Sequence, residues 1–341
     1  MAVTIKDVAK KAGVSISTVS KVIHGAPTIS EKTKQRVRNI MKELNYYPNI
    51  IGRSLASKSS FHIGLIMLLK KEDAFKNPYI YEILCGIEEE SRKRGYSLTI
   101  INVDTILQDP SELEKLISQK SIDGLLIHLT GFKKELTEIL DKHSFPYVFI
   151  GKPPFKTSTE WVDIDNRMAG EIATEHLHSA GCSRIGFIGD RLDLFICKIR
   201  YEGYKNYLKS KGIQINKQYI RESLDQNENI PNIIDNLLSL DNPPNGIVCS
   251  DNFIALEVLK ALHKKEIKVP SDMALITFDN YPFAPYTAPG LSTIDIDVFE
   301  LGVQSTDILI AKLAGDKELV QNVILTPSLI IRESSSRGIQ E

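Results

Sequence analysis

The alternation of short apolar segments with amphipathic ones after Ser60 is the feature that most constrains the fold of this 341-residue chain. Helical patterns such as YEILCGIEEESRKRGY and PSELEKLISQK separate the apolar segments. The candidate strands form two sets, the first at 61–69, 97–102, 123–129 and 146–151, and the second at 158–165, 184–190, 219–224, 245–251 and 273–279. Strands that alternate with helices predict parallel sheets covered on both faces. We therefore expect two similar doubly wound lobes.

The first sixty residues have a different pattern, in which apolar residues recur every three to four positions. This spacing predicts two short amphipathic helices with a tight turn between them. Gly13 permits the positive-φ turn that ends the first helix, and Ser15 can cap the second. Thr4 and Asp7 make a start signal for the first helix, and Ser30 starts a third. Two helices joined in this way predict a helix-turn-helix unit.

Charge is distributed unevenly along the chain. The net charge is -1, yet residues 1–60 hold eight Lys and three Arg against one Asp and two Glu, a net +8. The remaining residues therefore carry -9. A basic head on an acidic body is typical of a small module that binds a polyanion, attached to a larger domain with another task. The alternative is a three-helix bundle with a solvated basic face.

The second helix of the head presents small, hydroxyl-bearing or basic side chains outside its buried stripe. Such side chains suit base edges and phosphates in a major groove of DNA. They are Ile16, Ser17, Thr18, Ser20, Lys21 and His24.

The strings TIKDVAKKAGVSISTVSKVIHG, ISEKTKQRV and ELNYYPNIIGRSLAS resemble the DNA-binding head of the lactose/galactose repressor (LacI/GalR) family. The resemblance implies base reading by Ile16, Ser17 and Lys21. It implies backbone contacts from Thr4, Thr18, Ser20, His24 and Thr33.

The stretch YPNIIGRSLASKSS resembles the hinge helix of the same family, which forms against the minor groove of an operator. By this resemblance Asn49 and Arg53 reach phosphates, and Leu55 is the wedge inserted between base pairs. Gly52 costs this helix about 1 kcal/mol relative to Ala, so we expect the hinge to order only on DNA. A plain flexible linker is the alternative for this segment.

The body resembles the periplasmic-binding-protein-like core of this family in phrases such as VDIDNRMAGEIATEHLHSAGCSRIGFIGD, GIVCSDNFIALEVLKAL and PGLSTIDIDVFELG. That fold implies three crossings between lobes. We expect a helix-turn-helix domain at 1–48, a hinge at 49–60, an N-terminal lobe at 61–160 plus about 291–320, and a C-terminal lobe at 161–290 plus about 321–335.

Ligands of such folds bind between the lobes, at the carboxyl ends of strands. Lys152, Asp251 and Asp279 follow candidate strands. The resemblance also assigns Asp251 and Asp279 to the pocket, adds Arg200 as its arginine, and makes Tyr79 an aromatic face for a ring. Alternatives are helix caps for the two aspartates, a surface ion pair for Arg200 and core packing for Tyr79.

Several classes of protein are disfavoured. The longest apolar stretch, near 63–69, is far shorter than the about 20 residues of a membrane span. The N-terminus lacks a secretory pattern, so we expect a cytoplasmic protein. Cys85, Cys182, Cys197 and Cys249 form no CxxC pair, which argues against disulfides and a zinc site. No GxSxG, GxxxxGK[ST] or HExxH motif occurs, so we expect no catalytic residues, no cofactor and no metal.

These observations predict a sequence-specific DNA-binding transcription regulator, a repressor, controlled by a small-molecule effector. We expect a homodimer on a pseudopalindromic operator, since residues 331–341 carry no leucine heptad that would make a tetramer. The expected effector is a sugar, and VFIGKPPF, which is similar to maltose-type and glucoside-type regulators, slightly favours an oligosaccharide or glucoside. Alternatives are a regulator that responds to a protein or a non-sugar metabolite and, more distantly, an α/β enzyme with a DNA-binding head.

Overall fold

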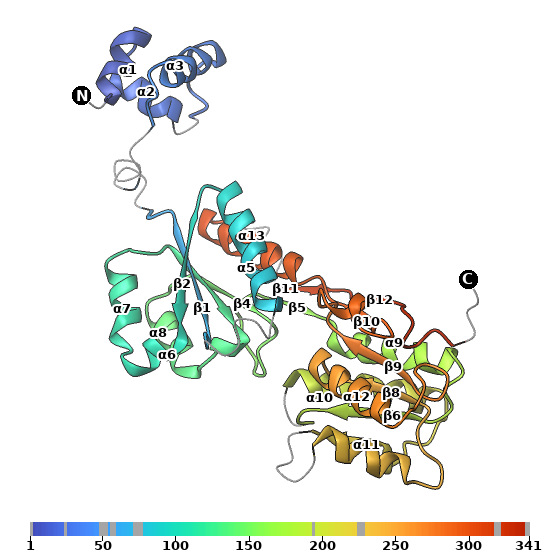
Figure 1. Ribbon diagram of the computed structural model, residues 1–341. Coiled ribbons are helices and arrows are strands. Elements are labelled where there is room, and N and C mark those ends of the chain that lie inside the picture. The colour runs from blue at the N-terminus through green and yellow to red at the C-terminus, as the bar shows by residue number, and fades with distance from the viewer. Residues whose placement is uncertain are drawn as a thin grey trace. The chain divides into compact units, whose positions relative to one another are not determined.

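The computed structural model describes residues 3–23, 26–47, 54, 59–70, 78–192, 195–223, 229–316 and 322–337. The chain divides into two compact units, Met1–Phe61, called the head here, and His62–Glu341, the body (Figure 1). The predicted fold class is confirmed: an all-α helix-turn-helix head and an α/β, periplasmic-binding-protein-like body of two doubly wound lobes.

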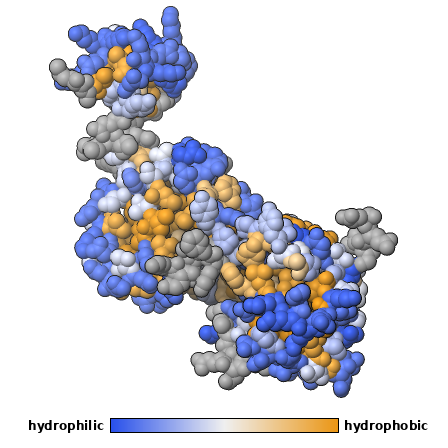
Figure 2. Space-filling model, in the orientation of Figure 1, coloured by the Kyte–Doolittle hydropathy of each residue, from blue (hydrophilic) through white to orange (hydrophobic). Residues whose placement is uncertain are grey.

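The head folds around a small apolar core. Its described helices are α1 (Ile5–Ala12), α2 (Ile16–Ile23) and α3 (Glu31–Glu43). Because the apolar residues recur with helical spacing, each helix turns one stripe inward. The fully buried members are Val8, Ala9, Ala12, Val19, Val22 and Val37. On the visible face of Figure 2, hydrophilic side chains cover most of the head.

Local signals at the helix ends set the tight turn. The Asp7 carboxylate accepts hydrogen bonds from the backbone N–H and the hydroxyl of Thr4, at 2.9 and 2.7 Å. Gly13 ends α1 in the left-handed region, with φ +61°. The Ser15 hydroxyl oxygen then accepts the backbone N–H of Thr18 at 3.1 Å and caps α2. The predicted helix-turn-helix is confirmed.

Two six-stranded sheets form the body. When the strands of each sheet are counted along the chain, the two sheets have the same spatial order of strands. The first has the order β11-β5-β4-β3-β1-β2, and all its neighbours are parallel. Its strands are β1 (His62–Met67), β2 (Ser97–Asn102), β3 (Gly124–His128), β4 (Tyr147–Ile150), β5 (Trp161–Ile164) and β11 (Asn322–Leu325).

The second sheet has the order β12-β10-β9-β8-β6-β7, in which only the β10–β12 pair of described strands is antiparallel. Its strands are β6 (Ile185–Gly189), β7 (Ile220–Glu222), β8 (Gly246–Cys249), β9 (Ala274–Phe278), β10 (Ser292–Asp295) and β12 (Ser328–Ile330). The central strands are buried throughout, as parallel strands covered on both faces must be.

Helices cover both faces of each sheet. In lobe 1, built on the first sheet, they are α5 (Pro78–Lys93), α6 (Val103–Gln108), α7 (Ser111–Ser118), α8 (Lys134–Lys142) and α13 (Val298–Ala314). In lobe 2, built on the second, they are α9 (Asn166–Ser179), α10 (Phe195–Ser210), α11 (Ile230–Leu238) and α12 (Asn252–Lys264). Alternate strand residues feed separate cores. Leu126 packs on the α5 and α13 side, for example, whereas Leu125 and Ile127 pack on the α6 to α8 side.

The lobe boundaries differ from those predicted. We expected 158–165 to open lobe 2, but β5 lies beside β4 in lobe 1. We expected 291–320 in lobe 1, whereas β10 is in lobe 2 and only α13 packs on lobe 1. The last apolar run was expected to finish lobe 2, yet Thr326 and Pro327 split it into β11 in lobe 1 and β12 in lobe 2. A proline interrupts a strand because it lacks a backbone N–H.

The chain crosses between the lobes three times, as the family fold implied. The crossings follow β5, β10 and β11. After each of these three strands, the next element along the chain belongs to the other lobe. The second crossing runs from Asp295 through Ile296 to Val298 at the start of α13. Within the described residues, no helix is long and apolar enough to cross a membrane.

Glycines let paired helices approach closely in both lobes. In lobe 1, Gly86 of α5 faces the backbone of Phe299 in α13. In lobe 2, a Cβ on Gly170 of α9 would lie 2.1 Å from the carbonyl oxygen of Arg200 in α10. Gly203 of α10 faces the backbone of α9 in the same way. A side chain at any of these positions would push two helices apart.

We predict that Gly170→Ala lowers the free energy of unfolding of the body by about 1 to 3 kcal/mol, because the new methyl group meets backbone that cannot rotate away. The better helix propensity of alanine, about 1 kcal/mol, opposes this effect. Urea unfolding of the full chain followed by circular dichroism measures the difference. Glu175→Ala, on the exposed side of α9, is the control. A Gly170→Ala protein as stable as this control would contradict the close packing.

Candidate functional site

The head presents the predicted DNA-contacting side chains largely at its surface. Ile16 of α2 is 44% exposed, a large fraction for an isoleucine, and Ser17 and Lys21 are also exposed. Thr18 and Ser20 are half-buried on the same helix, Thr4 is exposed before α1, and Thr33 is half-buried in α3. An exposed isoleucine among hydroxyl groups can make an apolar contact, for example with the methyl group of a thymine.

The hydroxyl groups at the start of α2 are already organised. The Ser15 hydroxyl lies 2.8 Å from the hydroxyl of Ser17 and 2.8 Å from that of Thr18. The Ser30 hydroxyl lies 3.0 Å from that of Thr33 at the start of α3. Hydroxyls held in this way can accept or donate a further hydrogen bond without reorganising. His24, Asn49, Arg53 and Leu55 lie outside the described residues.

The centre of the second candidate site is a buried guanidinium in lobe 2. Arg200 of α10 is 4% exposed and donates to three different elements. Its Nε donates to Asn166 Oδ1 of α9 at 3.0 Å, and its Nη1 donates to the Ser250 carbonyl at 2.8 Å. Its Nη2 donates to Asp279 Oδ1 at 2.7 Å, which forms a buried ion pair. The guanidinium also stacks 4.4 Å from the centroid of the Phe278 ring.

Asp279, whose carboxylate pairs with Arg200, has an unusual backbone conformation. Asp279 directly follows β9 and has φ +63°, in the left-handed region that aspartate tolerates better than most residues. Its N–H donates to the Ile294 carbonyl at 2.9 Å, and its carbonyl accepts the Asn252 side-chain amide at 2.6 Å. This turn aims the carboxylate across the carboxyl ends of the strands, where ligands of such sheets bind.

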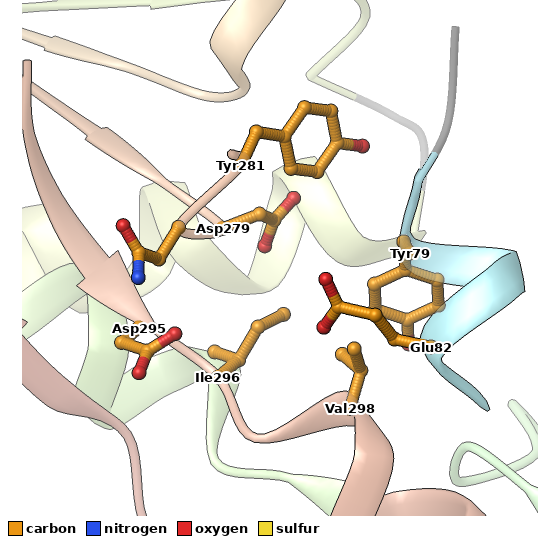
Figure 3. A pocket seen from close by; sticks show the side chains of 8 residues that line it. Tyr79, Glu82, Asp279, Tyr281, Asp295, Ile296 and Val298 are labelled. Carbon is orange, nitrogen blue, oxygen red and sulfur yellow. The ribbon is translucent and has the colours of Figure 1, made fainter. Parts of the chain in front are cut away.

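Residues of both lobes surround a small cavity next to Asp279 (Figure 3). Tyr79 and Glu82 come from the first turns of α5 in lobe 1. Asp279, Asn280 and Tyr281 come from the loop after β9, and Asp295, Ile296 and Val298 come from the second crossing. The free volume is about 20 Å³, room for about one water molecule. A larger ligand therefore requires the lobes or these side chains to move apart.

Burial and negative charge together shape the titration of this site. Burial raises the pKa of Glu82, and the negative charges of Asp295 and Asp297 raise it further. Burial also raises the pKa of Asp295, with a further contribution from Asp297. The pKa values of the Tyr79 and Tyr281 phenols are raised mainly by burial and then by Asp279, so both rings stay neutral.

Lobe 1 holds Tyr79 against a neutral histidine. The Tyr79 ring meets His128, at the end of β3, edge to face with centroids 6.2 Å apart. Burial lowers the pKa of His128 to about 4, so the imidazole is uncharged at neutral pH. Its Nδ1 lies 2.7 Å from the Thr130 hydroxyl. The histidine therefore supports the aromatic ring and adds no charge to the cavity.

Of the five predicted effector residues, two line the cavity and a third bonds to its wall, whereas the other two are not among the lining residues. Tyr79 and Asp279 line the cavity, and Arg200 is bonded to Asp279. Asp251 instead caps α12, accepting the N–H groups of Phe253 and Ile254 at 2.8 and 3.0 Å, as its alternative interpretation had it. Lys152 lies 5.2 Å from the centroid of the Trp161 ring. The roles of all five in ligand binding stay predictions.

Sequence reasoning missed several residues of this site. Glu82 lies three residues after Tyr79 and thus on the same side of α5, a signal that the helical period could have given. Asp295 was missed because no strand was predicted there and residues of about 291–320 were expected to belong to lobe 1. Within the described residues, no group of three or more His, Cys, Asp or Glu side chains could hold a metal ion. The four cysteines are free thiols.

Comparisons with known proteins match both the head and the body of this chain. Residues 4–49 match the family of bacterial regulatory proteins named lacI, and residues 174–335 match a periplasmic binding protein-like domain. The HTH-type transcriptional repressor PurR of Haemophilus influenzae strain PittEE is 32% identical over 338 residues, 97% of this chain and 98% of that protein. PurR of Mannheimia succiniciproducens is 30% identical over 335 residues, 97% of this chain and 98% of that protein.

Solved structures show the same fold at lower identity. The lac repressor dimer bound to operator and the anti-inducer ONPF has a TM-score of 0.73 and 23% identity, over 98% of this chain and 99% of that one. A complex of the transcriptional regulator CelR with cellobiose has a TM-score of 0.70 and 23% identity, over 97% and 99% of the two chains.

A helix-turn-helix head joined to a two-lobed, periplasmic-binding-protein-like body defines a DNA-binding transcription regulator. The chain belongs to the lacI family of bacterial regulatory proteins. It is a DNA-binding transcriptional repressor and not an enzyme.

We predict that Arg200→Lys lowers the free energy of unfolding by about 1 to 3 kcal/mol, because an ammonium cannot reproduce a guanidinium that bonds three elements at once. Thermal unfolding of the full chain measures the loss. Arg167→Lys is the matched control, since Arg167 makes an exposed ion pair with Glu202 at 2.7 Å. Equal stability of the two variants would show that Arg200 does not hold lobe 2 together.

Proposed function

We propose that this repressor binds a pseudopalindromic operator in the cytoplasm as a homodimer, and that a sugar bound between its lobes controls the affinity for DNA. The observation that carries the proposal is the composition of the cavity wall. It includes lobe 1, lobe 2 and the crossing between them, through Tyr79, Asp279 and Ile296. A ligand there contacts all three and can favour one arrangement of the lobes by differential affinity.

The chemistry of the wall supports a sugar. Carboxylates and an amide, from Glu82, Asp279, Asn280 and Asp295, supply acceptors for hydroxyl groups, and two tyrosine rings supply flat faces for a pyranose. The segment VFIGKPPF adds its resemblance to maltose-type and glucoside-type regulators. CelR, a protein of the same fold, forms a complex with cellobiose. A non-sugar metabolite or a protein co-effector is the alternative.

On DNA, we assign base reading to Ile16, Ser17 and Lys21 of α2. Backbone contacts are assigned to Thr4, Thr18, Ser20, His24 and Thr33. The predicted hinge at 49–60, the last part of the head, contributes phosphate contacts from Asn49 and Arg53 and a wedge from Leu55. The support for α2 is its exposed, hydroxyl-rich and basic surface at the end of a helix-turn-helix. Two heads presented by a symmetric dimer then read two halves of a symmetric site.

We predict that Lys21→Ala weakens operator binding by about 1 to 3 kcal/mol, because it removes a cation from the reading helix. The operator is first selected from genomic fragments, and fluorescence anisotropy then gives the affinity over a range of salt concentrations. Lys42→Ala, in the last turn of α3, removes the same charge outside the proposed surface. An equal loss in the two variants would reduce Lys21 to a general electrostatic contribution, and no loss would remove it from the interface.

The switch itself is tested by reciprocity. A thermal-shift panel of sugars, glycosides and nucleobases identifies a ligand, and calorimetry then measures its affinity with and without operator. Because the two binding events are coupled, DNA must change ligand affinity by the same factor by which ligand changes DNA affinity. Equal ligand affinity in both conditions would refute the switch. Binding by nucleobases and not by sugars would refute the sugar while leaving the repressor intact.

A further inference from the structure

We propose that the interlobe cavity selects an uncharged, donor-rich effector and rejects anionic ones, with Glu82 and Asp295 as the residues that determine this specificity. The inference rests on the proposed function, since it concerns the ligand of the same cavity. It narrows that ligand to a class, because free sugars, glycosides and nucleobases qualify and their phosphorylated derivatives do not.

Three carboxylates line this one small cavity. Glu82 comes from α5, Asp279 from the end of β9, and Asp295 from the second crossing. In Figure 3 the Glu82 carboxylate points from its helix toward the segment that carries Asp279. Glu82 and Asp295 are both partly buried, so water screens their charges less than it would at an open surface. Asp279 accepts a hydrogen bond from Arg200, and Asp295 accepts one from the backbone of Ile296. Each carboxylate has room to accept further hydrogen bonds, so the cavity wall is rich in acceptor oxygens.

The nearby cations, Arg200 and Arg332, donate their hydrogen bonds to groups other than Glu82 and Asp295. The described residues that line the cavity include no Lys, Arg or His. Arg200 donates its hydrogen bonds to Asp279, Asn166 and the Ser250 carbonyl. Arg332 donates to Asn280 Oδ1 at 2.7 Å and to the Leu291 carbonyl, also at 2.7 Å. Within the described part of the chain, neither Glu82 nor Asp295 takes part in an ion pair.

The groups facing this acidic pair add further negative charge. Asp297, at the N-terminus of α13, acts on both Glu82 and Asp295, and Asp279 acts on Asp295. Arg332 is the one cation among the groups that shift either pKa, and it opposes the effect on Asp295 only partly. Both neighbouring tyrosines stay neutral. A phosphate or carboxylate entering here would meet like charge at partly buried carboxylates, whereas hydroxyl and N–H groups could donate hydrogen bonds to them.

The first part of the test needs no ligand. Because the pKa of each carboxyl is raised in the folded protein, its ionisation destabilises the fold at neutral pH. Glu82→Gln and Asp295→Asn should therefore each raise the Tm of the full chain at pH 7.5, by about 1 to 4 °C. The gain should shrink as the pH falls toward about 4, where carboxyls are protonated in the unfolded chain. Glu88→Gln, on the exposed side of α5, is the matched control and should show no such gain.

The second part uses matched probes: maltose and maltose 6'-phosphate, glucose and glucose 6-phosphate, and adenosine and adenosine 5'-monophosphate. For any pair that binds, the uncharged member should bind wild-type protein at least about tenfold more tightly. This preference should weaken in the Glu82→Gln/Asp295→Asn double variant and persist in Glu88→Gln. A phosphorylated member that binds as tightly as its partner overturns the proposal.

The two parts separate the failure of this inference from that of the proposed function. If no probe binds, the sugar-controlled function loses its support, and the Tm measurements still decide whether the cavity is an unfavourable cluster of charge. If sugars bind but neither single variant raises the Tm, the charge inference is wrong and the sugar function stands. Raised Tm values together with a preference for uncharged probes support both.

Discussion

The organisation of lobe 2 depends on the buried Arg200 guanidinium. A charge taken out of water is tolerated only where its hydrogen-bonding groups are satisfied, and here three elements supply the acceptors: α9, the end of β8 and the end of β9. The planar fork fixes the directions of those elements, so the carboxyl ends of β8 and β9 are held beside α9 and α10. The glycine contact between α9 and α10 brings the arginine close enough to make these bonds.

The sequence predicted well those features that depend on local chemistry. The helix-turn-helix followed from the apolar spacing, Gly13 and the Ser15 cap, each of which acts within a few residues. Buried strands of lobe 1 and lobe 2 followed from apolar runs bounded by turn signals. The sheet to which a strand belongs is not a local property. β5 follows β4 with no intervening helix, so it was assigned to a new set, and β10 carries no mark of the sheet it joins.

The same distinction between local and non-local features applies to the residues of the candidate site. Asp279 and Arg200 could be predicted, because one follows a strand and the other lies in a phrase similar to a known family. Asp251 follows a strand equally well, yet its carboxylate caps α12. A strand-end aspartate can do either, and the difference lies in the backbone, which is left-handed at Asp279 and extended at Asp251. Glu82 and Asp295 meet only because α5 and the second crossing meet, which requires the tertiary fold.

Acidic groups at the second crossing connect the proposed ligand binding with the arrangement of the two lobes. Asp295 and Asp297 flank the segment that passes from lobe 2 to lobe 1, and Glu82 approaches it from lobe 1. Repulsion among these groups opposes close approach of the lobes on that side. Under the proposed function, a donor-rich ligand between them would replace this repulsion with hydrogen bonds and so favour an arrangement in which the lobes lie closer together. Because a two-state protein responds only to such differential affinity, a cavity that is electrostatically unfavourable without ligand gives a larger response than a neutral cavity would.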